Sequence, residues 1–397
     1  MKRILITVCI FIFVLSGCKT KAEDSKSYFS SCGIWLSYYE VGDMLKSSNG
    51  LQNELDDLIK NCKEIGVEEV YIHVRSHCDS LFLSDYFPIN ENAKIYDYDV
   101  FEYMISEFHK NSIKANAWIN PYRVSTESED INLLNKESPA YKWLTDTLPD
   151  NDKNVCFSDG IYLNPASEDV QILIINGVKE IVDKYDVDGV VFDDYFYPTI
   201  DKAFDSLSYE SYKSATQNPL KLEDWRRTNV NLLISGCYNA IKNKNENISF
   251  SVSPSHSIDR NYSDFYADVK YWVENGVVDK IIPQLYFGFE YPEKKYRFDE
   301  LLKSWKNIVD ENSNVELLIS LPAYKIGTDS KADYKEWNTE TDILSRQAEI
   351  CFKDDKIDGF VIFSYSSLFS KEELNTKQRN NLKDAVRTFE LPGNKNG

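Results

Sequence analysis

The sequence has few histidines, and its cysteines are not clustered. It contains four histidines, and its eight cysteines include no Cys-x-x-Cys pair and no Cys/His cluster. A zinc signature is therefore absent, and we predict neither a metal site nor a cofactor. Six cysteines lie outside the N-terminal segment and far apart in sequence, which favours buried thiols over a disulfide framework. They are Cys32, Cys62, Cys78, Cys156, Cys237 and Cys351.

Basic residues are also in deficit. Lysine and arginine number 45 against 64 aspartates and glutamates, which gives a formal net charge of −19. This balance argues against a nucleic-acid partner and against docking through a basic face. Aromatic residues make up 14% of the chain, with 26 tyrosines and seven tryptophans. Such flat amphipathic side chains can stack on sugars, although they are also ordinary core residues.

Long apolar runs are absent except at the N-terminus, which reads "MKRILITVCIFIFVLSGC". Two basic residues, an apolar run and small residues before a cysteine predict a signal peptide over residues 1–17 rather than a spanning helix. The ending is similar to a bacterial lipobox, so we expect lipidation of Cys18, with residues 18–30 as a polar tether. The predicted location is the bacterial cell envelope, on its periplasmic or outer-membrane face, with membrane contact through the lipid anchor alone. An ordinary cleaved signal with an incidental cysteine is the alternative.

The rest of the chain alternates short β-rich segments with longer segments of helical period. Eight segments predict strands, at 33–39, 69–75, 114–120, 189–196, 248–254, 280–287, 316–324 and 359–366. Seven predict helices, at 51–66, 99–112, 167–186, 223–244, 264–276, 298–310 and 340–355. This order predicts an α/β fold, a (β/α)8 TIM barrel over residues 31–385, followed by a flexible tail over 386–397. An open doubly wound sheet is the rival, but no glycine-rich turn follows the first strand.

The connections predict where the barrel carries its site. They are long after the third strand (121–166) and the fourth (197–222), whereas the turns from helix to strand are short. Extra chain therefore gathers at the C-terminal ends of the strands, the face on which TIM barrels build active sites.

Polar and aromatic residues converge at these strand ends. The set consists of Arg75, Asp79, Asn120, Tyr122, Arg123, Asp193, Asp194, Tyr195, Ser253, His256, Gln284, Tyr286, Tyr324, Lys325 and Tyr365. Single polar residues at strand ends are often merely solvated, but polar residues at seven ends favour a common mouth.

The adjacent pair Asp193 and Asp194 carries the sharpest chemical signal. Glycosidic cleavage needs a carboxylic acid that protonates the leaving oxygen, and a second anion nearby can keep that acid protonated. Both residues are therefore catalytic candidates. Adjacent side chains of a strand point to opposite faces, so one is expected to face the site and the other to be held by an arginine or by backbone amides. A strand end that forms a salt bridge is the structural alternative.

Several stretches, taken in order, resemble the bacterial glycoside hydrolase-like family 10. They are "AWINPYR" (117–123), "YLNP" (162–165), "VDGVVFDDYFYP" (187–198), "DWRRTNVN" (224–231) and "IIPQLYF" (281–287). The resemblance implies a (β/α)8 barrel with glycoside hydrolase activity on a polysaccharide, in some members peptidoglycan strands stripped of peptide. With the strand ends, it suggests the substrate-binding residues Arg75, Asp79, Asn120, Tyr122, Arg123, Asn164, Tyr195, Gln284, Tyr286 and Tyr324.

The sequence departs from the family after the second strand, where Arg75-Ser76-His77-Cys78-Asp79 replaces a Pro-x-Gly-Asp continuation and Cys78 stands for a glycine. This change puts the size or identity of the substrate in doubt. The fourth strand is also similar to that of the family 18 chitinases, but Tyr195 stands where their catalytic glutamate would be.

The sequence leaves open which group takes the second catalytic role and whether the barrel is catalytic. The second catalytic role could fall to Asp79, to Glu290, or to a 2-acetamido group of the substrate assisted by Tyr286 and one aspartate. No carboxylate ends the seventh strand. A non-catalytic barrel that binds glycans or proteins at the cell surface is therefore the alternative function.

Overall fold

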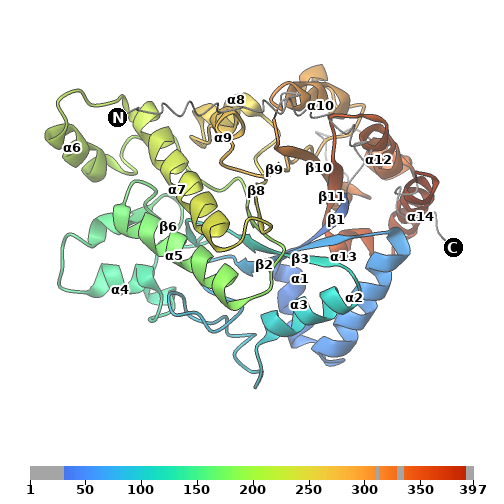
Figure 1. Cartoon of the computed structure of the whole chain (residues 1–397), viewed down its shortest axis with the longest axis horizontal. Coiled ribbons are helices and arrows are strands. Elements are labelled where there is room, and N and C mark those ends of the chain that lie inside the picture. Colours follow the sequence, from blue (N-terminus) through green and yellow to red (C-terminus); the bar gives the residue numbers. More distant parts are fainter. Residues whose placement is uncertain (1–30, 310–312, 329–334, 390–397) are drawn as a thin grey trace, which may run out of the picture.

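The computed structural model describes residues 31–309, 313–328 and 335–389, and it confirms the predicted TIM barrel (Figure 1). Eight parallel strands close in the order β1-β11-β10-β9-β8-β7-β3-β2. The predicted signal peptide, Cys18 and the tether lie outside the described residues.

The barrel strands follow the predicted segments with shorter ends. They are β1 (Ser31–Leu36), β2 (Glu69–Arg75), β3 (Lys114–Ile119), β7 (Gly189–Phe192), β8 (Ser249–Val252), β9 (Lys280–Ile281), β10 (Glu316–Pro322) and β11 (Gly359–Phe363). β9 is short because Pro283 has no N–H to donate, although Gln284 still bridges to Ser255 and Ser320.

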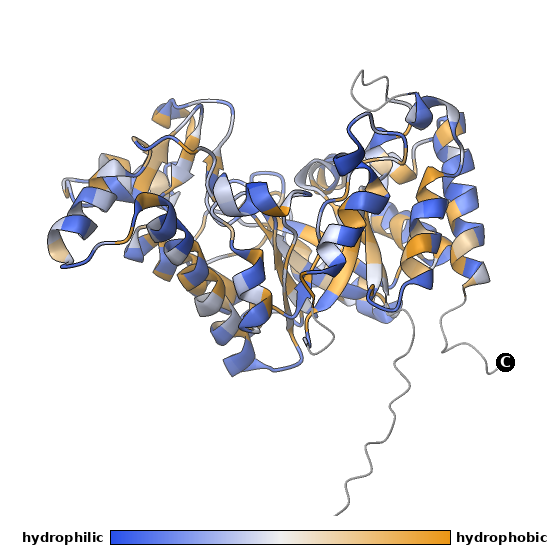
Figure 2. Ribbon diagram, turned by 90° about the horizontal axis from the view of Figure 1, so that it is seen from above, coloured by the Kyte–Doolittle hydropathy of each residue, from blue (hydrophilic) through white to orange (hydrophobic). Residues whose placement is uncertain are grey.

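Helices surround the barrel, with their apolar residues turned toward the strands (Figure 2). The main ones are α2 (Leu51–Ile65), α3 (Val100–Lys110), α5 (Glu168–Lys184), α7 (Leu222–Lys244), α8 (Ile258–Ser263), α9 (Val269–Glu274), α10 (Phe298–Lys306), α12 (Ile343–Lys353) and α14 (Glu373–Thr388). Within the described residues, no helix has the length and hydropathy needed to cross a membrane.

Two predicted boundaries are wrong. The first strand does not reach residue 39, because Ser37 and Glu40 form a capping box that starts α1 (Tyr38–Lys46). The predicted flexible tail begins too early, because α14 continues to Thr388 and buries Leu382 and Ala385. The sequence from residue 390 onward lies outside the described residues.

The two long connections contain elements that the sequence did not predict. After β3, the strands β4 (Arg123–Ser125), β5 (Val155–Phe157) and β6 (Ile161–Leu163) form a small antiparallel sheet beside α4 (Pro139–Thr145). After β7, the connection carries α6 (Ser206–Ala215). Both insertions extend from the same side of the barrel, at the left of Figure 1.

The lumen is filled by side chains, so it is not a channel. One cluster inside the barrel contains Trp35, Tyr71, Trp118, Val191, Ile282, Leu318 and Val361, and a larger apolar cluster contains strand and helix residues such as Ile34 and Leu55. The six predicted thiols are all buried and unpaired. A packed lumen leaves the strand ends and their loops as the place for chemistry.

Candidate active site

The site consists largely of the residues two positions beyond the packed lumen layer. Side chains alternate along a strand, so the residue two positions after each lumen residue points the same way. The lumen residues Tyr71, Trp118, Val191, Ile282, Leu318 and Val361 are followed in this way by His73, Asn120, Asp193, Gln284, Ser320 and Phe363. Three of them, Asn120, Asp193 and Gln284, were predicted from the sequence. The same period of two could have identified His73, Ser320 and Phe363.

Asp193 lies at the end of β7 and is 3% exposed. Its Oδ2 accepts hydrogen bonds from the indole Nε1 of Trp118, at 3.1 Å, and from the amide of Asn120. Its Oδ1 accepts the backbone N–H of Tyr195 at 3.3 Å. The carboxyl group is thus fixed by donors from β3 and from its own loop, as expected for a residue that must hold one orientation.

Asp194 is more accessible and faces other partners. It is partly exposed, and its Oδ1 accepts a hydrogen bond from Gln284 Nε2 at 3.0 Å. Gln284 Nε2 also donates to the backbone oxygen of Ser253, which fixes the amide between β8 and β9. The two aspartates therefore have separate supports, and the more exposed one has fewer side-chain donors among the described residues.

Burial dominates the electrostatics of the pair. It raises the pKa of Asp193 to about 7, with Arg123 opposing the shift and Asp194 adding to it. It also raises the pKa of Asp194, against the hydrogen bond from Gln284. Because the two carboxyl groups interact, the proton released near neutral pH belongs to the pair rather than to one residue. A carboxyl group that keeps a proton at neutral pH is suited to general acid catalysis.

Aromatic side chains flank the pair. The guanidinium of Arg123 lies 4.0 Å from the ring centroid of Tyr195, whose side chain is 52% exposed. On the other side, the ring of Tyr286 packs 5.6 Å from those of Tyr324 and Phe363. The Tyr286 hydroxyl is 3.0 Å from Ser320 Oγ, which also accepts from Trp35 Nε1. This arrangement provides stacking faces and a hydroxyl at one mouth.

Behind Asp193, a buried histidine completes a chain of hydrogen bonds. His73 Nε2 contacts Asn120 Oδ1, and Asn120 Nδ2 donates to Asp193. Since Asn120 uses its amide as the donor to Asp193, His73 must donate from Nε2. Burial, together with the charge of Arg123, lowers the pKa of His73 well below its usual range, so the ring is neutral. It stacks on Trp118 with centroids 3.7 Å apart.

Three predicted substrate-binding residues lie away from the mouth. Arg75 is buried with its guanidinium 3.7 Å from the Phe87 ring centroid, close to the backbone of Gly177 on α5. Tyr122 is fully buried in the apolar core. Asn164 donates to the Lys153 backbone oxygen at 2.7 Å and to Ser208 Oγ at 2.9 Å. In these positions they support the barrel and its loops rather than face a substrate.

Arg75 leaves the lumen because β2 is irregular at its end. The pairing of β2 with β3 shifts register between His73 and Arg75, so the alternation that turns Tyr71 and His73 inward is broken there. Asp79 lies farther along the same connection. Its Oδ1 accepts the backbone N–H groups of Ser76 and His77, and its Oδ2 accepts from Asn90 at 2.7 Å. It therefore fixes the loop that borders the mouth.

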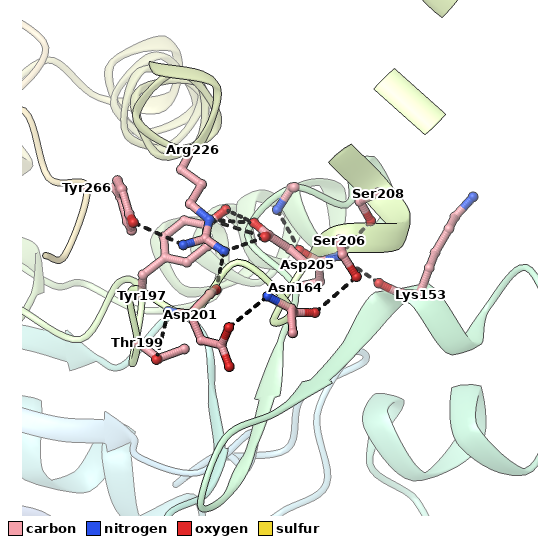
Figure 3. Close-up of polar contacts among 12 residues, drawn as sticks. Lys153, Asn164, Tyr197, Thr199, Asp201, Asp205, Ser206, Ser208, Arg226 and Tyr266 are labelled. Carbon is pink, nitrogen blue, oxygen red and sulfur yellow. Dashed lines mark hydrogen bonds and ion pairs between the residues drawn. The ribbon is translucent and has the colours of Figure 1, made fainter. Parts of the chain in front are cut away.

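The connection after β7 is held by a buried ion pair (Figure 3). Arg226 Nη2 on α7 donates to Asp205 Oδ1 at 2.6 Å and to the backbone oxygen of Asp201 at the same distance. The hydroxyl of Tyr197 donates to Asp205 at 3.1 Å, and that of Tyr266 accepts from Arg226 Nη1 at 3.0 Å. The segment that starts at the aspartate pair is thereby fixed to the helix. Among the residues that the structure describes, no three His, Cys, Asp or Glu side chains are grouped to bind a metal.

Comparisons with a family model and with known protein sequences both give glycosyl hydrolases. The family model described as "Glycosyl hydrolase-like 10" matches residues 31–339. The chain is 31% identical to glycosyl hydrolase YngK of Bacillus subtilis, over 94% of this chain and 75% of that protein. It is 29% identical to glycosyl hydrolase DigH of Escherichia coli K12, over 88% and 86% of the two chains.

Solved structures share the fold at low sequence identity. The glycoside hydrolase domain of PgaB from Bordetella bronchiseptica superposes with a TM-score of 0.59 at 13% identity, covering 88% of this chain and 98% of that one. An Anoxybacillus α-amylase gives a TM-score of 0.54 at 12% identity, covering 91% and 78%.

Proposed function

The chain belongs to the glycosyl hydrolase-like 10 family, and from this we propose that it hydrolyses glycosidic bonds in an envelope polysaccharide whose sugars carry 2-acetamido groups. Peptidoglycan glycan strands are a polymer of this kind. The observation that carries the proposal is the Asp193–Asp194 pair at the barrel mouth, one carboxyl group buried and the other partly exposed, supported by Trp118, Asn120 and Gln284.

Asp194 is the proton donor in this proposal. In an interacting pair the pKa values do not assign the proton to one residue, so access decides. Asp194 is the more exposed of the two, whereas Asp193 is 3% exposed and accepts three hydrogen bonds. Donors directed at a carboxyl group favour its ionised form, so Asp193 is the anion that remains beside the reacting sugar.

The second carboxylate of most glycosidases has no clear counterpart among the described residues. Asp79 is held by two backbone N–H groups and Asn90, and Glu290 is an exposed residue whose backbone N–H donates to Glu336. β10 ends in Leu321 and Pro322 without a carboxylate. These placements favour the substrate's own acetamido oxygen as the nucleophile.

The reaction then runs in two steps. Asp194 gives its proton to the glycosidic oxygen, the bond from C1 to that oxygen breaks with its electron pair moving to the oxygen, and the acetamido carbonyl oxygen bonds to C1. Asp193 stabilises the resulting positive ring, while Tyr286 contacts the acetamido group. In the second step a water oxygen attacks C1, the ring bond breaks and restores the acetamide, and Asp194 takes a proton from the water.

The test is the release of reducing ends from chains that contain N-acetylglucosamine. Wild-type protein is expected to cleave them, and Asp193→Asn and Asp194→Asn are each expected to lower the rate by about 100-fold or more, because an acid or its anionic partner is lost. Glu290→Gln is the matched control and should retain the wild-type rate. Hydrolysis of glucans or xylans at a comparable rate would contradict the acetamido mechanism.

A barrel that binds glycans without cleaving them is the second candidate, because β10 lacks the carboxylate that many retaining barrel glycosidases have there. Binding of the same oligosaccharides without any release of reducing ends by the wild type would support this candidate.

A further inference from the structure

We propose that two hollows beside the mouth, at the ends of β1 and β2, are subsites for further sugar units, so that the protein binds a glycan along several units and cleaves it internally. This inference rests on the proposed function, which it extends from one reacting sugar to the surrounding chain.

The hollows are separate spaces with a common wall. The first has a volume of about 270 Å³ and is lined by Asp43, Lys46, His73, Ser76, Asn90 and Asn92, among others. The second has a volume of about 370 Å³, with a lining that includes His77, Ser125, Thr126, Glu127 and Asn135. Tyr38, Tyr39 and Asp79 line both. Their amide and hydroxyl side chains are the groups that fix the orientation of a polar ligand in such a site.

Contacts through neighbouring residues connect both hollows to the aspartate pair. His73 lines the first, and through Asn120 it is two hydrogen bonds from Asp193. The second is lined by Val124 and Ser125, which follow Arg123, and Arg123 stacks on Tyr195 beside the pair. A glycan whose reacting sugar lies at Asp194 would therefore extend over Tyr38 and Tyr39 on this side.

The common wall is an aromatic surface that neighbouring rings support. The rings of Tyr38 and Tyr39 lie 4.1 Å apart at an angle of 32°. Tyr38 is braced by edge contacts with His73 at 5.5 Å and His77 at 5.0 Å. Tyr39 is 66% exposed, so its outer face is open. A large aromatic ring that is exposed yet supported from behind suits stacking against the flat face of a sugar.

The charges of the lining disfavour a polymer that carries a carboxylate on every sugar unit. The lining contains three carboxylates, those of Asp43, Asp79 and Glu127, and one lysine, Lys46. The positive charge of Arg123 also lies close enough to act on the pKa of Tyr38 and of His77. Cationic side chains are therefore not in excess, and a row of carboxylates on a uronic acid polymer would meet more repulsion than attraction.

The experiment measures binding to full-length Asp194→Asn protein by calorimetry, with N-acetylglucosamine oligomers of two, four and six units as the probe. Affinity is expected to rise with length. Adding Tyr39→Ala should weaken binding of the hexamer by about tenfold, the size of one lost aromatic contact, and leave the dimer unchanged. Tyr262→Ala, which removes an exposed tyrosine elsewhere, is the control and should change nothing. An oligogalacturonide hexamer should show no dependence on Tyr39.

The outcomes separate this inference from the proposed function. Binding that does not depend on length, or a hexamer affinity unaffected by Tyr39→Ala, overturns the inference even if the wild type hydrolyses the hexamer. Binding that depends on both, without hydrolysis by the wild type, supports the subsites and contradicts the proposed catalysis. Early products of wild-type hydrolysis give a second readout: internal fragments are expected, and release of single end units alone would overturn internal cleavage.

Discussion

At the scale of single residues, Asp193 combines a functional position with an energetic cost. Burial raises its pKa to about 7, from an ordinary value of 3.8. Between these two values the folded protein retains, on the interacting Asp193–Asp194 pair, a proton that the unfolded chain has released, so the free energy of unfolding falls as the pH rises through this window. The charged groups that face Asp193 and Asp194 are Arg123 and, more distantly, Arg260, with Tyr195 also nearby.

Asp193→Asn is therefore expected to stabilise the protein as the pH rises. Its free energy of unfolding, relative to the wild type, should increase by about 2–4 kcal/mol between pH 4 and pH 8, because the variant does not have to hold two negative charges side by side in the folded protein. Urea unfolding at the two pH values measures the difference. Asp150→Asn, at an exposed position, is the control and should show no such change. An equal effect of Asp193→Asn on the free energy of unfolding at both pH values would show that the folded protein does not retain this proton.

The sequence predicted the central residues of the site but not their full setting. The ends of parallel strands meet at one face, and this arrangement brings together Asp193, Asp194, Asn120, Arg123, Tyr195 and Gln284. Arg75 is directed elsewhere by an irregularity in β2, which no pattern of residue types in this sequence reveals. The period of two along β2 places His73 in line with the lumen, but nothing in the sequence indicates its contact with an asparagine 47 residues later.

At the scale of elements, the loop after β7 depends on a buried ion pair. Arg226 and Asp205 are both fully buried, and the pair joins the loop to α7 (Figure 3). Removing one partner leaves an unpaired charge in the interior, which typically costs about 3–5 kcal/mol, whereas replacing both by apolar residues costs less.

Asp205→Leu and Arg226→Met are each expected to destabilise the protein by about 3–5 kcal/mol, and the double variant by less than the sum. Thermal or urea unfolding of the four proteins completes the cycle. The exposed pair Glu373 and Lys377 on α14 is the control, and its removal should leave stability unchanged. Additive effects at Arg226 and Asp205 would show that the pair does not act as a unit.

The elements themselves were largely predictable, with exceptions that have local causes. Strands and helices of the barrel repeat apolar residues with periods of two and 3.6, which the sequence displays directly. β4, β5 and β6 have three residues each, too few for a period to emerge. α14 was missed because its apolar residues are sparse, and its buried positions include Asn375 and Gln378.

At the scale of the whole molecule, we propose from the sequence that Cys18 is lipidated and anchors the barrel to the bacterial envelope. The formal net charge of −19 argues against membrane binding through a basic face. The full-length protein should fractionate with membranes, and Cys18→Ala should release it into the soluble fraction. Cys351→Ala, at a buried thiol of the barrel, serves as the control. An unchanged distribution of Cys18→Ala would contradict anchoring through this residue.

The proposed reaction requires the aspartate pair to act on a sugar that supplies its own nucleophile. Proton NMR of an N-acetylglucosamine hexamer during hydrolysis by the wild-type protein tests this most directly, because it detects cleavage and the configuration of the new anomeric centre together. Two displacements at C1 predict that the first product retains the configuration of the bond that was broken. Inversion would require a water activated by a second carboxylate, and the absence of any new anomeric signal would mean that the barrel does not cleave these chains. Either result would contradict the proposed reaction.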